Sequence, residues 1–154
     1  MKVQVLHALA LALCASLFFG CGLLSLDEKN GGLRNLIERN KSNWEKSNIK
    51  NYSLSYDKTV GGSETNDVYV LVVQEEIDSV SVGGAAAESF EGFLTVDRLY
   101  DEIEKNFERD DRGTFQVNFN EEFSYPLRYR MLPGETTEGR GVVVENFEVL
   151  NDDE

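Results

Sequence analysis

Histidine and cysteine are almost absent from this chain of 154 residues, which contains one histidine and two cysteines. His7 and Cys14 both lie in the apolar N-terminal segment, so removal of that segment would leave only Cys21. A Ser-His-Asp triad and a Cys-His dyad both need histidine, and a tetrahedral zinc site needs several Cys or His ligands. The sequence therefore predicts no catalytic residue, no metal site and no cofactor.

Basic residues are also scarce. The chain has 15 Lys and Arg against 28 Asp and Glu, which gives a net charge of −13. Nucleic acid is bound by clustered cations that neutralise phosphates, so this charge argues against a nucleic-acid partner. An anionic lipid surface would repel the chain as well, and attachment to a membrane would need a covalent lipid. No Walker A motif is present, and Gly83-Gly84 lacks the spacing of a dinucleotide-binding loop.

The N-terminus has the arrangement of a bacterial lipoprotein signal. A short charged start with Lys2 is followed by an apolar run over residues 3–19 and then by Gly20-Cys21. In such signals the cysteine is acylated and becomes the new N-terminus. We expect residues 1–20 to be a signal peptide and Cys21 to carry the lipid that anchors the protein outside the cytoplasm. Two alternatives remain open, an uncut signal anchor and ordinary cleavage.

The rest of the chain has the size and composition of one folded domain. Apolar residues make up 41% of the chain, which includes nine Phe, six Tyr and one Trp. This content argues against a disordered tail. We expect a lipidated tether over residues 21–32, a single domain over residues 33–150 and an acidic tail over residues 151–154.

Hydrophobic periodicity predicts two helices and six strands. Apolar residues recur at helical spacing in two segments and alternate with polar residues in several others. Thr95 is a natural N-cap for the second helix. The expected helices are residues 33–44 and 95–107, and the expected strands are residues 52–56, 68–73, 77–82, 115–119, 123–131 and 142–149. Short turns join most strands, which predicts an α+β fold with an antiparallel sheet of five to six strands and both helices on one face. The expected order is helix, three strands, helix, three strands.

Several motifs in this order resemble a bacterial family of small exported domains, the domain-of-unknown-function family 6174. In that family a helix with a tryptophan precedes a strand that begins with tyrosine, and these residues are Trp44 and Tyr52 here. The family's T-V-D-x-L-F/Y helix start reads T-V-D-R-L-Y at residues 95–100. Its strand ending in Y-D…G-Y-P reads F-N-E-E-F-S-Y-P at residues 119–126. The likeness extends over about residues 33–150.

The chain departs from the family pattern in three places. Asn120 stands where the family has aspartate, and Ser124 stands where it has glycine. Many members have cysteines after the first strand, whereas this chain has Gly61-Gly62-Ser63 nearby. No disulfide or metal role can therefore be transferred to that region. The resemblance implies an exported, often lipid-anchored domain, and it implies no reaction.

Aromatic and acidic residues supply a candidate binding face. Tyrosines on one face of a sheet could bind a peptide or a glycan. The competing interpretation is that these rings form the core. The candidate residues are Tyr52, Tyr56, Glu121, Glu122, Tyr125 and Tyr129.

Three functions are compatible with these patterns. The first is a non-enzymatic binding or accessory module at the cell envelope, with an envelope protein as its partner and the membrane contacted through the lipid on Cys21. The second is a hydrolase of envelope glycan that uses two carboxylates. The third is a structural lipoprotein stabilised by calcium, with Glu108, Asp110 and Asp111 as the candidate ligands.

Overall fold

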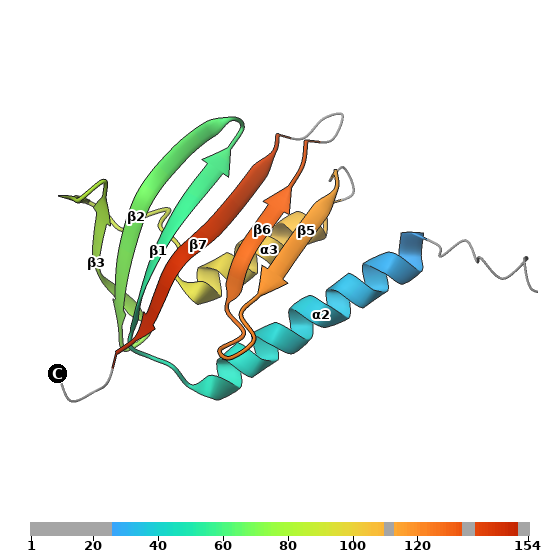
Figure 1. Ribbon diagram of the computed structural model, residues 1–154, viewed down its shortest axis with the longest axis horizontal. Helices are drawn as coiled ribbons and strands as arrows, with labels where there is room; N and C mark the ends of the chain where they lie inside the picture. Colours follow the sequence, from blue (N-terminus) through green and yellow to red (C-terminus); the bar gives the residue numbers. More distant parts are fainter. Residues whose placement is uncertain (1–25, 110–112, 134–137, 151–154) are drawn as a thin grey trace, which may run out of the picture. The chain divides into compact units, whose positions relative to one another are not determined.

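The structure is a computed structural model that describes residues 26–109, 113–133 and 138–150 (Figure 1). Every pair of neighbouring strands is antiparallel, and the strand order across the sheet is β4-β3-β2-β1-β7-β6-β5. The α+β class with an antiparallel sheet is therefore confirmed. The elements are α2 (Leu26–Ser47), β1 (Tyr52–Val60), β2 (Ser63–Val73), β3 (Glu76–Val82), β4 (Ala85–Ala86), α3 (Val96–Phe107), β5 (Phe115–Phe119), β6 (Pro126–Met131) and β7 (Arg140–Val149).

The predicted strand count and order were wrong. The described residues form seven strands, and four of these precede α3. The additional strand is β4, which lies in a segment that the sequence marks only as small residues. Gly83 and Gly84 both have positive φ angles, of 56° and 80°, which is the backbone of a two-residue hairpin turn. This turn brings Ala85 and Ala86 back beside Val82 and Ser81.

The first helix is longer than the sequence pattern predicted. The described residues divide into two units, one that ends at Asn35 and one that begins at Leu36. In the described part of the first unit, residues 26–35 are helical, so Gly31 and Gly32 lie in a helix and not in an extended tether. Glycine costs about 1 kcal/mol relative to alanine in a helix interior, which is why the glycine pair argued against this extension.

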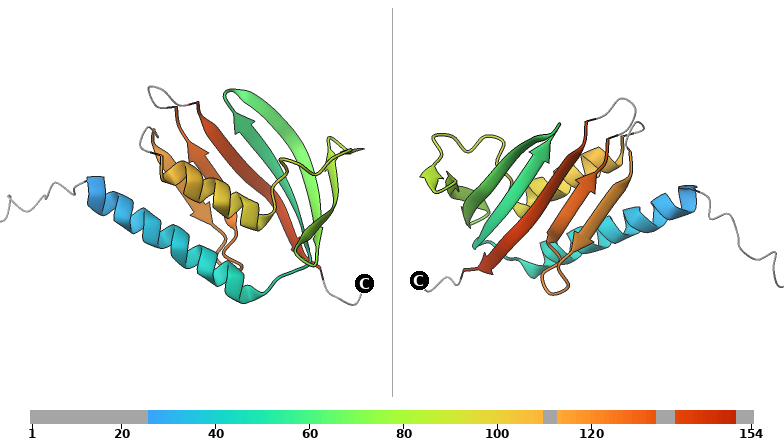
Figure 2. Two further views of the ribbon diagram at one scale, coloured as in Figure 1. Left: turned by 180° about the vertical axis from the view of Figure 1, so that it is seen from behind. Right: turned by 45° about the horizontal axis from the view of Figure 1, so that its top comes forward.

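One face of the sheet forms the core of the second unit. Side chains alternate along β1 and β2, so every second residue points to the face that carries the helices, which are in front of the sheet in the left view of Figure 2. On this face Val70 and Val72 are fully buried, and α3 adds Leu99 and Ile103. Trp44 packs edge-on against Tyr52 with ring centroids 5.5 Å apart. Its indole N–H also donates a hydrogen bond to the Asp97 carboxylate at 3.0 Å.

Two tyrosine hydroxyls of β1 attach the beginning of α3 to the sheet. The first N–H groups of a helix have no partner within the helix. The Tyr52 hydroxyl accepts a hydrogen bond from the Val96 N–H at 3.0 Å, and the Tyr56 hydroxyl accepts one from the Leu94 N–H at 2.9 Å. The hydroxyl of Thr95 accepts a third from the Arg98 N–H at 3.2 Å, which confirms the predicted N-cap.

The turn between β5 and β6 explains two of the three places at which the chain differs from the family pattern, Asn120 and Ser124. The Asn120 side-chain oxygen accepts hydrogen bonds from the N–H groups of Glu122 and Phe123, at 3.0 and 2.7 Å, and aspartate can accept the same bonds. Ser124 has a φ angle of 62°, in the left-handed region that favours glycine. Its carbonyl oxygen also accepts a hydrogen bond from the Tyr100 hydroxyl, which ties this turn to α3.

We predict that Ser124→Gly raises the free energy of unfolding by about 1 kcal/mol, because the left-handed conformation strains a residue that has a Cβ atom. The measurement is urea unfolding followed by circular dichroism. Ser124→Ala is the matched control, since it removes the hydroxyl and keeps the Cβ. Equal stability of the glycine and alanine variants would contradict the strain.

Candidate functional site

The four candidate tyrosines are buried on the side of the sheet that the helices cover. Tyr52, Tyr56 and Tyr129 are at most 2% exposed, and Tyr125 is 7% exposed. Burial raises the pKa of all four hydroxyls above the ordinary value. Their rings therefore belong to the core and do not line a surface.

The remaining candidates lie elsewhere. Glu121 and Glu122 are exposed in the turn between β5 and β6, so the six residues do not form one face. A binding role for these two glutamates stays a prediction. Cys21 lies outside the described residues, and so do Asp110 and Asp111 of the predicted calcium loop. In the described part of the chain no group of three or more His, Cys, Asp or Glu residues could hold a metal ion.

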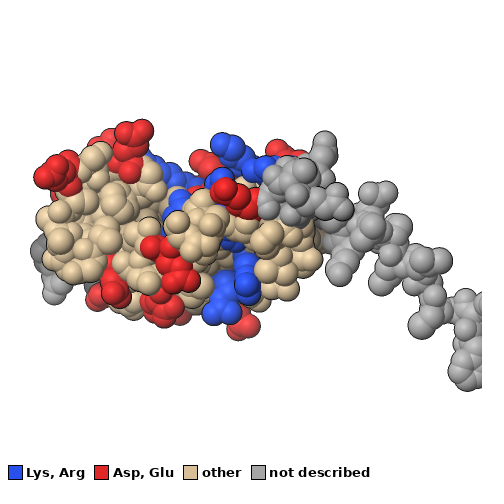
Figure 3. All heavy atoms as spheres, turned by 90° about the horizontal axis from the view of Figure 1, so that it is seen from above, with Lys and Arg blue, Asp and Glu red and all other residues tan. Residues whose placement is uncertain are grey.

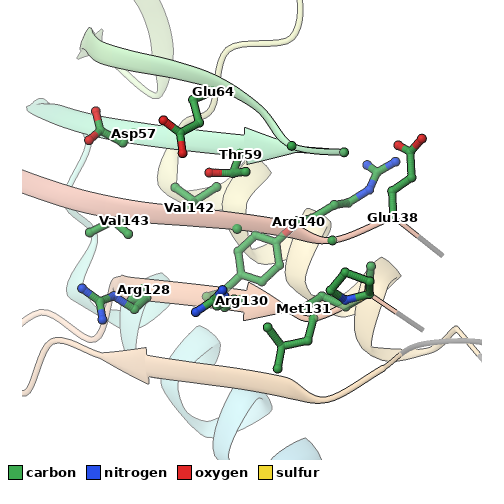
Figure 4. A pocket seen from close by; sticks show the side chains of 17 residues that line it. Asp57, Thr59, Glu64, Arg128, Arg130, Met131, Glu138, Arg140, Val142 and Val143 are labelled. Atoms are coloured by element: carbon green, nitrogen blue, oxygen red, sulfur yellow. The ribbon is translucent and has the colours of Figure 1, made fainter. Parts of the chain in front are cut away.

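The uncovered face of the sheet is hollowed along β7 (Figure 4). The hollow has a volume of about 590 Å³, within the range of about 300–1,000 Å³ that is typical of ligand pockets. Strand register places its central residues in two rows across three strands. The first row is Asp57, Val143 and Arg128. The second row is Thr59, Gly141 and Arg130. The residues that define this charged groove are Asp57, Thr59, Glu64, Arg128, Arg130, Gly141 and Val143.

The two sides of the charged groove carry opposite charges. Arg128 and Arg130 are alternate residues of β6, so both project from the uncovered face on one side of β7. Asp57 of β1 and Glu64 of β2 project from the same face on the other side. The Asp57 carboxylate accepts a hydrogen bond from the Asp67 N–H at 2.9 Å, which holds it at the edge of the groove.

Gly141 forms part of the groove floor. It lies between Thr59 and Arg130 in the second row and has no side chain. A Cβ atom at this position would lie 3.2 Å from the Tyr129 carbonyl oxygen, which is a tight contact. The floor of the groove therefore carries no side chain at this position, and a larger residue would press against β6.

Both arginines on the basic side are exposed and have no partner among the described carboxylates. The ion pairs of the described residues include those of Lys41, Lys50 and Lys58, and neither Arg128 nor Arg130 takes part in one. In the view of Figure 3, acidic groups dominate the end of the molecule towards β3, and basic groups gather towards its middle. In an acidic chain, two neighbouring guanidinium groups that pair with no described carboxylate can bind an external anion.

A second charged cluster lies on the covered side and is structural. The Lys58 ammonium donates a hydrogen bond to the Glu102 carboxylate at 3.0 Å, and the Tyr129 hydroxyl donates one to its other oxygen at 2.8 Å. Asn106 donates a hydrogen bond to the Tyr129 hydroxyl at 3.2 Å. These bonds satisfy polar groups in the core and connect α3 to β1 and β6.

Sequence reasoning missed the charged groove although one signal was present. In residues 127–131, L-R-Y-R-M, two arginines alternate with Tyr129. Assigning Tyr129 to one face of a strand implies that Arg128 and Arg130 share the other face. The residues opposite them could not be identified, because the pairing of β1 with β7 joins the two ends of the domain.

This architecture defines the chain as a small α+β domain in which helices cover one face of an antiparallel sheet. The profile of a family of unknown function, DUF6174, matches residues 36–149, and the chain therefore belongs to that family. The match begins within α2 and ends at the last residue of β7. No curated protein matches the chain in sequence. Of the helices in the described residues, none has both the length and the apolar character needed to cross a bilayer.

We predict that the folded protein loses stability above about pH 10. Unfolded tyrosines ionise near pH 10, while burial raises the pKa of Tyr52, Tyr56 and Tyr129 and keeps them protonated in the folded state. Their contribution is therefore complete below pH 10 and is lost as the pH rises. The expected loss is about 1 kcal/mol per tyrosine between pH 10 and pH 11.

The measurement is urea unfolding at several pH values, together with tyrosinate absorbance of the folded protein. Tyr56→Phe should flatten the pH dependence by one tyrosine. Tyr69→Phe is the control, because it removes a hydroxyl from a side chain that is 39% exposed and lies outside the core. Full ionisation of all tyrosines at pH 11 without unfolding would contradict the prediction.

Proposed function

We propose that this protein is a non-enzymatic binding module of the bacterial cell envelope, anchored by a lipid on Cys21, and that it captures an envelope protein through the uncovered face of its sheet. The observation that carries this proposal is the charged groove. The helices bury one face, whereas the other presents a hollow of about 590 Å³ between two sides of opposite charge.

An apolar strip beside the groove supports a protein partner. Tyr69 and Val73 of β2 are exposed, at 39% and 40%, and lie on the uncovered face with Leu71 between them. Ser55 and Ser53 of β1 stand opposite Tyr69 and Leu71. Protein interfaces combine an apolar centre with a polar rim, and a strip flanked by small hydroxyl side chains beside charged groups has both components.

The lipid anchor in this proposal rests on the N-terminal sequence. A single acyl chain binds a membrane only marginally, while two or more anchor a protein stably. An acidic domain gains nothing from an anionic lipid surface. The membrane contact is therefore assigned to the lipid on Cys21, and the sheet face is left to the protein partner.

A carboxylate hydrolase of envelope glycan is the second candidate, because Asp57 and Glu64 both line the groove. Glycoside hydrolysis needs two carboxyl groups that flank the scissile bond. The two candidates differ in the residues on which they depend, since the binding module needs both sides of the groove and the hydrolase needs the acidic side.

We predict that Arg128→Glu together with Arg130→Glu abolishes capture of the envelope partner. The experiment is in vivo crosslinking and affinity capture with a C-terminal tag, comparing wild type, this double variant and Cys21→Ala. The control is Arg39→Glu with Lys46→Glu, which makes the same change in charge at exposed positions of α2. One envelope protein that is captured by wild type and the control, and lost in the other two, is the expected result.

Capture that is unaffected by the double arginine variant would remove the groove from the proposal. The hydrolase is tested separately with purified protein and envelope glycan. Release of glycan fragments by wild type, lost in Asp57→Asn, would replace the binding module with the enzyme.

A further inference from the structure

We infer that the charged groove takes an extended polypeptide segment in which acidic and basic side chains alternate, lying along β7 with its acidic residues towards Arg128 and Arg130. This inference names the ligand class of the same groove and rests on the proposed function. Three features of the groove carry it: the spacing along each side, the distance between the sides, and the floor.

The spacing along the basic side matches that of an extended chain. Arg128 and Arg130 are two residues apart on one strand, so their Cα atoms are separated by about 6.5–7 Å. In an extended ligand, side chains at positions i and i+2 point the same way and have the same separation. Two acidic residues at alternate positions can therefore meet both guanidinium groups at once. Neither group has to leave an ion pair with a described carboxylate.

The distance between the sides requires a ligand of comparable width. β7 lies between β6 and β1, so the Cα atoms of Arg130 and Thr59 are two strand spacings apart, about 9–10 Å. An extended chain sends alternate side chains in opposite directions, so residues i+1 and i+3 face the acidic side. Asp57 and Glu64 stand there, and the Thr59 hydroxyl lies next to Glu64, where it can accept or donate a hydrogen bond.

The floor leaves space for a backbone. Gly141 and Val143 are the β7 residues of the groove, and the glycine lies in the row between Thr59 and Arg130. A polypeptide backbone can therefore come close to the sheet at Gly141. Pro133 and Glu138 line one end of the hollow.

Ligands with charge of one sign do not fit. A nucleic acid or another polyanion would meet the carboxylates of Asp57 and Glu64, and a polycation would meet the two arginines. A charge pattern that alternates every residue is favourable on both sides, whereas the same charges in two blocks are not. The groove therefore discriminates between ligands of equal composition by the order of their charged residues.

The test compares two eight-residue peptides with the full-length protein in detergent micelles. One peptide alternates glutamate and lysine, and the other has four glutamates followed by four lysines, so composition and net charge are equal. We expect the alternating peptide to bind at least tenfold more tightly by calorimetry, and its affinity to fall as salt is added.

Two variants probe the charge and the shape of the groove separately. Arg128→Glu with Arg130→Glu should weaken binding of the alternating peptide at least tenfold. Gly141→Val keeps every charge and fills the floor with a residue that strands favour, and it should weaken binding to a similar extent. Arg39→Glu with Lys46→Glu is the matched control and should bind as wild type does. Circular dichroism of each variant establishes that it is folded.

Equal affinity for the two peptides would overturn the inference, and so would unchanged binding by Gly141→Val, because both results would mean a diffuse attraction between charges. Failure here is distinguishable from failure of the proposed function. The peptides could bind equally while capture of the envelope protein still needs Arg128 and Arg130. That result would support the proposed binding module and reject the proposed ligand class.

Discussion

The attachment of α3 to β1 through two tyrosine hydroxyls is the interaction on which the rest of the structure depends. Tyr52 and Tyr56 accept hydrogen bonds from the N–H groups of Val96 and Leu94, which would otherwise be unpaired at a buried helix start. Losing one such acceptor leaves a buried donor unsatisfied, at a cost of about 1–3 kcal/mol. The rings of the same tyrosines are packed in the core. Each tyrosine therefore buries apolar surface and also provides a hydrogen-bond acceptor for a buried N–H group. These tyrosines therefore decide which face of the sheet is covered.

The residues buried on the covered face determine which residues lie on the uncovered face of the sheet. Strand residues alternate between faces, so each buried residue of β6 or β7 has neighbours that must face solvent. Tyr129 is buried with its hydroxyl bonded to Glu102, and Arg128 and Arg130 are consequently displayed outside. Val142 is buried beside it, and Gly141 and Val143 form the outer floor. The residues of the charged groove and the core residues therefore alternate along the same strands and lie on opposite faces of the sheet.

Local features of the sequence predicted both helices and most of the strands, whereas β4 was missed and the pairing between distant segments could not be predicted. Thr95 and the apolar spacing that follows it identify α3 correctly because a helix is stabilised by residues close in sequence. The strands follow from alternation for the same reason. The pairing of β7 with β1 depends on contacts between segments about 90 residues apart, and no local pattern encodes them. The groove combines residues of four strands, so it was invisible until that pairing was known. The tyrosines were ambiguous because an aromatic residue on a strand suits a core and a binding surface equally.

The place of β7 in the sheet has a consequence for how the protein is made. β7 follows all the other strands in the sequence, yet it lies inside the sheet, between β1 and β6. Before residues 140–149 emerge during synthesis, β1 to β4 and the β5–β6 hairpin have no strand to join them. Pairing over such sequence separations is slow, because a long loop must close before any contact is gained. A nascent chain therefore cannot complete its sheet until its last strand is inserted, and a chain truncated before residue 140 would lack both the continuous sheet and the groove floor.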